Sequence, residues 1–151
     1  MQILRKWLRL PASERRLTVQ MALLLGMIHF GLKLFSLRRM RKILDWGLRA
    51  WPTSQGMDDH VLDRASWAVS AIGRRLPGLS NGPCLAQALA VQLLYQRQGL
   101  PAELYIGVAR GTGSRLEAHA WVESAGHIVI GGPREELEQY TRLPALDGKL
   151  T

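Results

Sequence analysis

The sequence predicts an α+β fold in which one buried helix packs against a small antiparallel sheet. Three observations indicate it. Segment 84–98 is apolar around nearly its whole circumference, as expected of a helix in the interior. Three strand-like segments follow, at 102–110, 117–123 and 127–130, separated by short turns that contain glycine. With 151 residues and 47% apolar content, the chain has room for one such core and an appendage.

The basic character of the chain lies in its N-terminal third. Residues 1–50 carry eleven Lys or Arg against two acidic residues, whereas residues 51–151 carry nine against ten. Nucleic-acid-binding proteins spread Lys and Arg over a docking face and combine them with aromatic platforms. Because residues 51–151 are close to neutral, we expect no nucleic-acid partner.

Residues 1–50 are expected to be helical, and segment 17–37 is the most apolar part of the chain. Its polar side chains His29, Lys33 and Ser36 share one stripe of a helix. Positive charge on both flanks, together with Lys33 inside the segment, argues against a membrane-spanning helix. We therefore expect a helix that packs on the core, on a partner or on an anionic membrane surface.

Turn-forming residues predict a hinge at 51–59, and residues 60–151 are expected to form the core. Within the core, a helix is expected from about 58 to 75, since its apolar residues recur on one side and its charges suit the helix dipole. The Pro- and Gly-containing run 77–83 ends it. After the strands we expect a short helix near 135–140 and then a loop.

The helix at 84–98 has clear start and stop signals. Pro83 suits the first helical turn, where its missing N–H costs nothing. Gly99 supplies the C-terminal stop, and Pro101 prevents continuation. Cys84 therefore stands in the first turn of this helix.

Cys84 is the single cysteine of the chain, so no intrachain disulfide is possible and a reducing, cytoplasmic location is expected. At a helix N-terminus, free backbone N–H groups and the positive dipole end lower the pKa of a thiol. The same N–H groups can stabilise an oxyanion. The competing interpretation is a small buried side chain, because free cysteine is among the most frequently buried residue types.

His119 is the expected general base. In strand 117–123 it shares one face with Trp121, which can shield the imidazole from water, while Ala118 and Ala120 leave room for close packing. A cysteine at a helix start combined with a strand histidine matches the nucleophile-and-base arrangement of thiol acyl transfer.

Further residues are candidates for contact with the substrate. Gln87 lies one turn after Cys84, where it would donate to an oxyanion or contact substrate, or else simply satisfy a neighbouring strand. Asn81 and Gly82 line the approach to the thiol in either case. No Cys/His spacing brings several ligands together, so neither a metal nor another cofactor is expected.

The chain resembles the B protein of lasso-peptide biosynthesis, in its leader-peptidase form, over about residues 60–133. The resemblance rests on five short blocks in the same order, which are Cys84–Leu89, Gln98–Ala102, Ile106–Val108, Ala118–Glu123 and Gly131–Pro133. Residues 1–50 are similar to that family in character only.

The resemblance implies a papain-related, transglutaminase-like core that removes the leader from a ribosomally made precursor peptide. It implies Cys84 as nucleophile and His119 as general base. It also implies three partners, namely the precursor peptide, a small leader-recognition protein and the ATP-dependent lasso cyclase.

One departure from the family pattern concerns the third catalytic residue. The family has an Asp that orients the histidine, expected on the strand after the His strand, but residues 127–133 of this chain contain no carboxylate. Glu117, on the same face as His119, and Glu135 are the candidate substitutes. Two alternatives to peptide hydrolysis stay open. A Cys–His pair does not show whether water or an amine resolves the thioester, so one alternative is acyl transfer to an amine. The missing Asp motivates the other, a non-catalytic precursor-binding module.

Overall fold

The computed structural model describes residues 12–50, 59–73, 83–111 and 115–143. In chain order its elements are α2 (Ala12–Leu34), α3 (Leu37–Ala50), α4 (Asp59–Gly73), α5 (Pro83–Arg97), β1 (Glu103–Arg110), β2 (Leu116–Ser124), β3 (His127–Ile130), α6 (Arg134–Leu137) and β4 (Thr141–Arg142).

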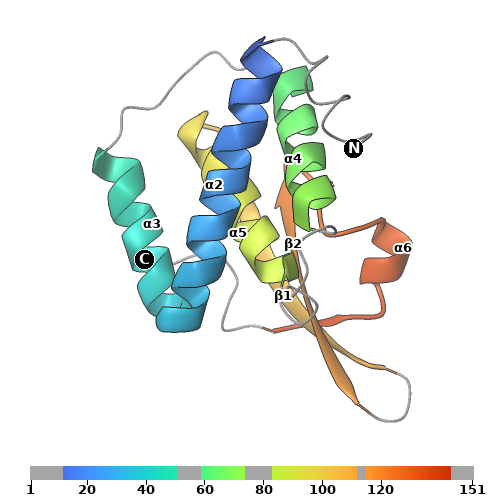
Figure 1. Ribbon diagram of the computed structural model, residues 1–151. Coiled ribbons are helices and arrows are strands. Elements are labelled where there is room, and N and C mark those ends of the chain that lie inside the picture. Colours follow the sequence, from blue (N-terminus) through green and yellow to red (C-terminus); the bar gives the residue numbers. More distant parts are fainter. Residues whose placement is uncertain (1–11, 51–58, 74–82, 112–114, 144–151) are drawn as a thin grey trace, which may run out of the picture.

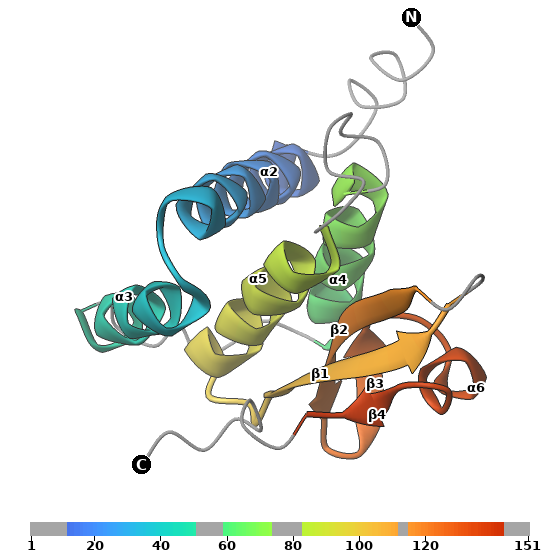
Figure 2. The same cartoon turned by 90° about the horizontal axis from the view of Figure 1, so that it is seen from below.

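The elements form layers around the central helix α5 (Figure 1). Seen from below, α4 and α5 lie between α2 on one side and the sheet on the other (Figure 2). The four strands are antiparallel and ordered β3-β2-β1-β4. The predicted α+β fold, with a buried helix on a small antiparallel sheet, is confirmed.

Helix α5 is buried because small apolar side chains cover most of its surface. Its alanines let α4, α2 and the sheet approach closely, and the residues with at most 1% exposure are Ala86, Ala88, Leu89, Ala90 and Val91. Its one buried polar side chain, Gln92, donates from Nε2 to the carbonyl oxygen of Ala102 at 3.1 Å, just before β1. This bond fixes α5 against the sheet.

The strands pair unevenly along β2. Strand β1 pairs with β2 over its full length, from Glu103 opposite Glu123 to Arg110 opposite Leu116. Strand β3 pairs with β2 only from Ser124 to Val122, with a register shift between Val122 and Glu123. The half of β2 that carries His119 is therefore not covered by β3.

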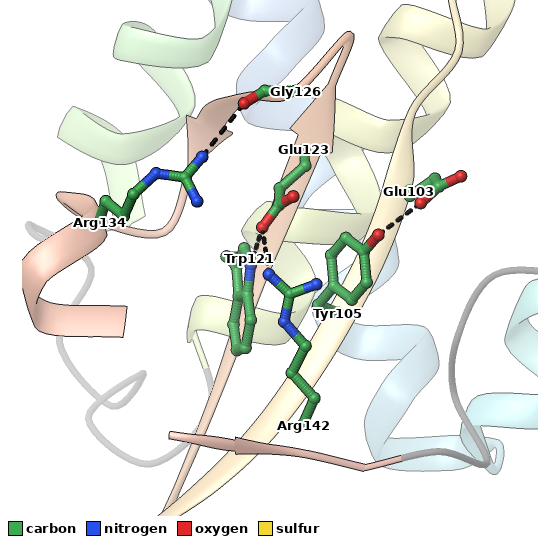
Figure 3. A network of polar contacts seen from close by, with 7 residues as sticks. All are labelled: Glu103, Tyr105, Trp121, Glu123, Gly126, Arg134 and Arg142. Carbon is green, nitrogen blue, oxygen red and sulfur yellow. Dashed lines mark hydrogen bonds and ion pairs between the residues drawn. The ribbon is translucent and has the colours of Figure 1, made fainter. Parts of the chain in front are cut away.

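The sheet face away from α5 carries a stack of aromatic and charged side chains (Figure 3). The rings of Tyr105 and Trp121 stack with centroids 5.7 Å apart, and the Arg142 guanidinium lies 4.2 Å above the Tyr105 ring. Arg142 also forms an ion pair with Glu123 at 2.8 Å, and Trp121 Nε1 donates to the same carboxylate. Because Arg142 lies on β4, these contacts hold β4 and the adjacent Tyr140 against the sheet.

The N-terminal helices add to the same interior. Met21, Leu25, Ile28 and Met40 belong to the hydrophobic core formed with α4 and α5. Gly31 makes this possible for Met40, whose Cε lies 1.9 Å from where a Cβ at Gly31 would be. Within the described residues, no helix has the length and apolar character needed to cross a membrane. Of the three surfaces expected for this segment, the core is thus one that it contacts.

One expectation for this region is wrong in detail, because the apolar segment 17–37 is not one helix. Helix α2 ends at Leu34, and α3 begins at Leu37. Ser36 precedes α3, and its carbonyl oxygen accepts the first helical hydrogen bond from the Met40 N–H at 3.0 Å. Serine is a favoured residue at this position, and it separates the two helices.

Two further expectations concern the hinge at 51–59 and the loop after 135–140. The predicted hinge at 51–59 lies outside the described residues except for Asp59, which begins α4. In the predicted loop after 135–140, the chain instead adds the two-residue strand β4 to the edge of the sheet. A strand of two residues is too short to give an alternation pattern, so the sequence does not predict it.

Candidate active site

Cys84 lies in the first turn of α5, as predicted, and its side chain is half-buried rather than enclosed in the core. Its thiol forms a hydrogen bond with the imidazole of His119 on β2. The two residues that the sequence proposes as nucleophile and base are thus in direct contact. Packing of α5 on β2 brings them together across a separation of 35 residues.

The surroundings of Cys84 favour its thiolate form. Burial raises the pKa of the thiol, but the hydrogen bond with His119 opposes this effect. The backbone N–H groups of Ala120 and Leu85 also bond to the sulfur, and the imidazole adds a favourable charge. Together these contacts lower the pKa of Cys84 below its ordinary value. Ala120 can donate because β3 pairs with β2 only as far as Val122.

The imidazole of His119 is held between two partners. Its Nε2 lies 2.6 Å from the carbonyl oxygen of Gly131. A carbonyl only accepts, so Nε2 carries the hydrogen and donates it, which leaves Nδ1 for the sulfur of Cys84. The bond with Cys84 raises the pKa of His119, burial lowers it, and the carbonyl of Gly131 and the charges of Cys84 and Glu136 raise it, with a net rise. Opposite shifts of the thiol and imidazole pKa values favour an ion pair.

Gly131 occupies a position that only glycine fits. Its φ of +125° lies in a region that residues with a Cβ rarely adopt. A Cβ placed there would lie 2.2 Å from the Cβ of Trp121. Trp121 and the glycine backbone therefore pack in direct contact, and this contact places the Gly131 carbonyl at Nε2 of His119.

The two carboxylates suggested as orienting groups are not among the described partners of His119. Glu117 is exposed and lies against Gly111 at the β1–β2 hairpin, and Glu135 is exposed on α6. The group that accepts the Nε2 hydrogen is the Gly131 carbonyl, at the end of β3. The described carboxylate whose charge acts on His119 is that of Glu136.

A pocket of about 180 Å³ opens beside the sulfur and the imidazole. Gln87 lines it, as expected for a residue one turn after Cys84. The other lining residues are Ser70, Ala120, Ile130, Gly131 and Gly132. The predicted contributors Asn81 and Gly82 lie outside the described residues.

No arrangement of three or more His, Cys, Asp or Glu side chains that could hold a metal ion occurs in the described parts of the chain.

The aromatic ring in contact with His119 belongs to Tyr140. The two ring centroids are 5.3 Å apart, and burial raises the pKa of Tyr140, as do the negative charges of Glu117, Cys84 and Glu136. Trp121, expected from the sequence to shield the imidazole, instead stacks on Tyr105 and supports Gly131. No sequence pattern indicates a role for Tyr140, because it lies in a segment with no strong periodicity.

The lowered pKa of the Cys84 thiol has a testable consequence for its reactivity. A free thiol loses about tenfold of its thiolate for each pH unit below its pKa. We expect iodoacetamide to label Cys84 at pH 6 at least about tenfold faster than a free model thiol. In His119→Ala the burial remains and the strongest opposing contact is lost, so the labelling rate should fall below that of the model thiol at the same pH.

Intact-mass measurement of labelling rates over about four pH units, from about pH 5 up to about pH 9 near the ordinary thiol pKa, tests this expectation. Because Cys84 is the single cysteine, the mass reports on this residue alone. Equal rates for the wild type and the model thiol at pH 6 would show that the thiolate is not stabilised.

Comparison with known proteins gives one result. A family model described as the Transglutaminase-like superfamily matches residues 24–145, more than half of the chain. The matched region begins within α2 and ends just after β4, so it contains both residues of the hydrogen-bonded pair. No curated protein and no solved structure matches the chain.

Proposed function

Because the chain belongs to the transglutaminase-like superfamily, which includes cysteine peptidases and acyltransferases, we propose that it is a cysteine peptidase that removes the leader from a lasso precursor peptide. The observation that carries the proposal is the hydrogen-bonded pair of Cys84 and His119 beside an open pocket, with pKa values shifted in opposite directions. The lasso precursor, as the particular substrate, is supported by the five sequence blocks.

In the proposed reaction the Cys84 thiolate attacks the carbonyl carbon of the scissile peptide bond and forms a C–S bond. The N–H of Cys84 and the side-chain amide of Gln87 are the candidate donors to the resulting oxyanion. His119 gives its Nδ1 proton to the leaving amine as the C–N bond breaks. Water then attacks the thioester, His119 accepts its proton, and the thiolate leaves.

We further propose that the Gly131 carbonyl takes the orienting role of the absent Asp. It fixes the tautomer and the direction of the imidazole through Nε2, as a carboxylate would. A neutral carbonyl stabilises an imidazolium less than a charged carboxylate does. The charge of Glu136 adds to this stabilisation from a distance.

The pocket favours a peptide over a whole small molecule as substrate. Its volume of about 180 Å³ is smaller than the pockets of about 300–1,000 Å³ that enclose drug-sized ligands. Gly131 and Gly132 form part of its wall without side chains, so an extended backbone can approach closely.

We propose the precursor peptide, a leader-recognition protein and the lasso cyclase as partners, and the cytoplasm as the location.

The test incubates the full chain with a precursor peptide and the leader-recognition protein and records product masses. Hydrolysis gives a leader and a core peptide whose summed mass exceeds that of the precursor by one water. Protein alkylated beforehand with iodoacetamide is the control and should give no product. Cleavage products that carry an added amine instead of water would indicate an acyltransferase, and a complex without cleavage would indicate a binding module.

A further inference from the structure

The outer side of α2 presents an apolar stripe that no described element covers. Four large side chains on it, spaced four, three and four residues apart, are 62–69% exposed, and they are Leu23, Met27, Phe30 and Leu34. This spacing places them on one line along the helix, about 16 Å long at 1.5 Å per residue. The line lies opposite the buried residues Met21, Leu25 and Ile28, so α2 is apolar on two sides.

The exposed apolar stripe of α2 is not what the sequence predicts for this region. The sequence predicts one apolar helix with a narrow polar side formed by His29, Lys33 and Ser36. In the structure His29 is half-buried, and Ser36 lies between the helices. The core uses one apolar side of α2, and the opposite apolar side remains exposed. Surfaces of this kind commonly mark an interaction site.

Positive charge predominates around the stripe, although Asp45 is exposed on α3 beside Trp46. Between Glu14 and Asp45 the sequence contains seven Lys or Arg and no acidic residue. Of these, Lys33 is exposed on α2 between Phe30 and Leu34, and Arg39 and Lys42 are exposed on α3. Two exposed apolar side chains follow them on α3, Ile43 at 48% and Trp46 at 73%. Apolar and aromatic side chains next to cations are typical of helices that lie in the interface of an anionic membrane.

We propose that the outer stripe of α2, with the adjacent cations, docks on the surface of a membrane that contains anionic lipids. The apolar side chains enter the boundary between headgroups and acyl chains, and the cations contact lipid phosphates. The proposal is independent of the peptidase activity. In Figures 1 and 2, α2 lies on the opposite side of α4 and α5 from the sheet that carries His119. Docking there leaves the pocket accessible.

Vesicle flotation with the full chain tests the proposal. We expect binding to vesicles of phosphatidylcholine mixed with phosphatidylglycerol at least about tenfold stronger than to phosphatidylcholine alone, and weaker binding at high salt. The double variant Leu23→Ser and Phe30→Ser should lose at least about tenfold in binding. The charge variant Lys33→Glu and Lys42→Glu should lose a similar factor.

Leu116→Ser is the matched control, because Leu116 is also a large exposed apolar residue, at 75%, but lies on β2 at the hairpin. It should bind vesicles like the wild type. Equal binding to neutral and anionic vesicles, or loss of binding in the control, would overturn the proposal. The proposal would also be overturned if the protein bound neither kind of vesicle and formed a dimer that the Leu23 and Phe30 variant converts to a monomer. In that case a second copy of the chain would cover the stripe.

Discussion

Replacing Cys84 by alanine is expected to reduce the rate of precursor cleavage by at least about 10³-fold. The reason is chemical, because the sulfur forms the covalent bond to the substrate and no other described residue that lines the pocket has a thiol. Ser70 also lines the pocket and has a hydroxyl, but it lies on α4. The Cys84–His119 pair is formed by residues of α5 and β2, and Ser70 is not a member of it.

The fold should tolerate this change. Cys84 is half-buried, and its neighbours Ala86 and Leu89 carry the packing of α5 on the core. The free energy of unfolding of Cys84→Ala should therefore stay within about 1 kcal/mol of the wild type, as measured by denaturant titration. Cys84→Ser is a second probe, since its hydroxyl keeps the size of the thiol but ionises far less readily. Cleavage at the wild-type rate by either variant would remove Cys84 as the nucleophile.

How far the sequence predicts this site depends on how local each signal is. The position of Cys84 follows from Pro83 before it and Gly99 after the helix, which are short-range signals. The strand that carries His119 follows from alternation over a few residues. For the same reason the patterns predict α4, α5 and strands β1 to β3 close to their observed bounds. They do not predict β4 or the break between α2 and α3.

The partner of His119 could not be predicted in the same way. A search for a third catalytic group looks for a carboxylate, but a backbone carbonyl has no signature in the sequence. What places the carbonyl is the end of β3 pairing at Ile130 and the contact between Gly131 and Trp121. Both are properties of tertiary packing. The pair Gly131-Gly132 was visible only as part of a family-like block, without a stated role.

The second large effect is expected from Gly131→Ala. The added Cβ would lie 2.2 Å from the Cβ of Trp121 and 2.9 Å from its Cα, and a Trp121 side-chain rotation moves neither atom away. The φ of +125° adds backbone strain of about 1–3 kcal/mol. With overpacking of a similar size, we expect a loss of about 2–6 kcal/mol in the free energy of unfolding, measured by denaturant titration.

Gly131→Ala should also lower the reactivity of Cys84. Relief of the clash with Trp121 moves the Gly131 carbonyl away from Nε2 of His119. The carbonyl raises the pKa of His119, so its displacement lowers that pKa and weakens the stabilisation that His119 gives to the Cys84 thiolate. Labelling of Cys84 by iodoacetamide at pH 6 should then approach the rate of a free thiol, under conditions where circular dichroism shows a folded protein.

Gly132→Ala separates the effect of backbone strain from the effect of the clash with Trp121. Gly132 has nearly the same φ, +122°, but a Cβ there would meet only Glu136 Oε2, at 3.4 Å. It should therefore show the backbone strain of about 1–3 kcal/mol without the clash and without displacement of the carbonyl. Fast labelling at pH 6 should persist in Gly132→Ala and be lost in Gly131→Ala. If both variants label equally fast, the backbone carbonyl is not the group that orients His119, and a side chain must supply that role.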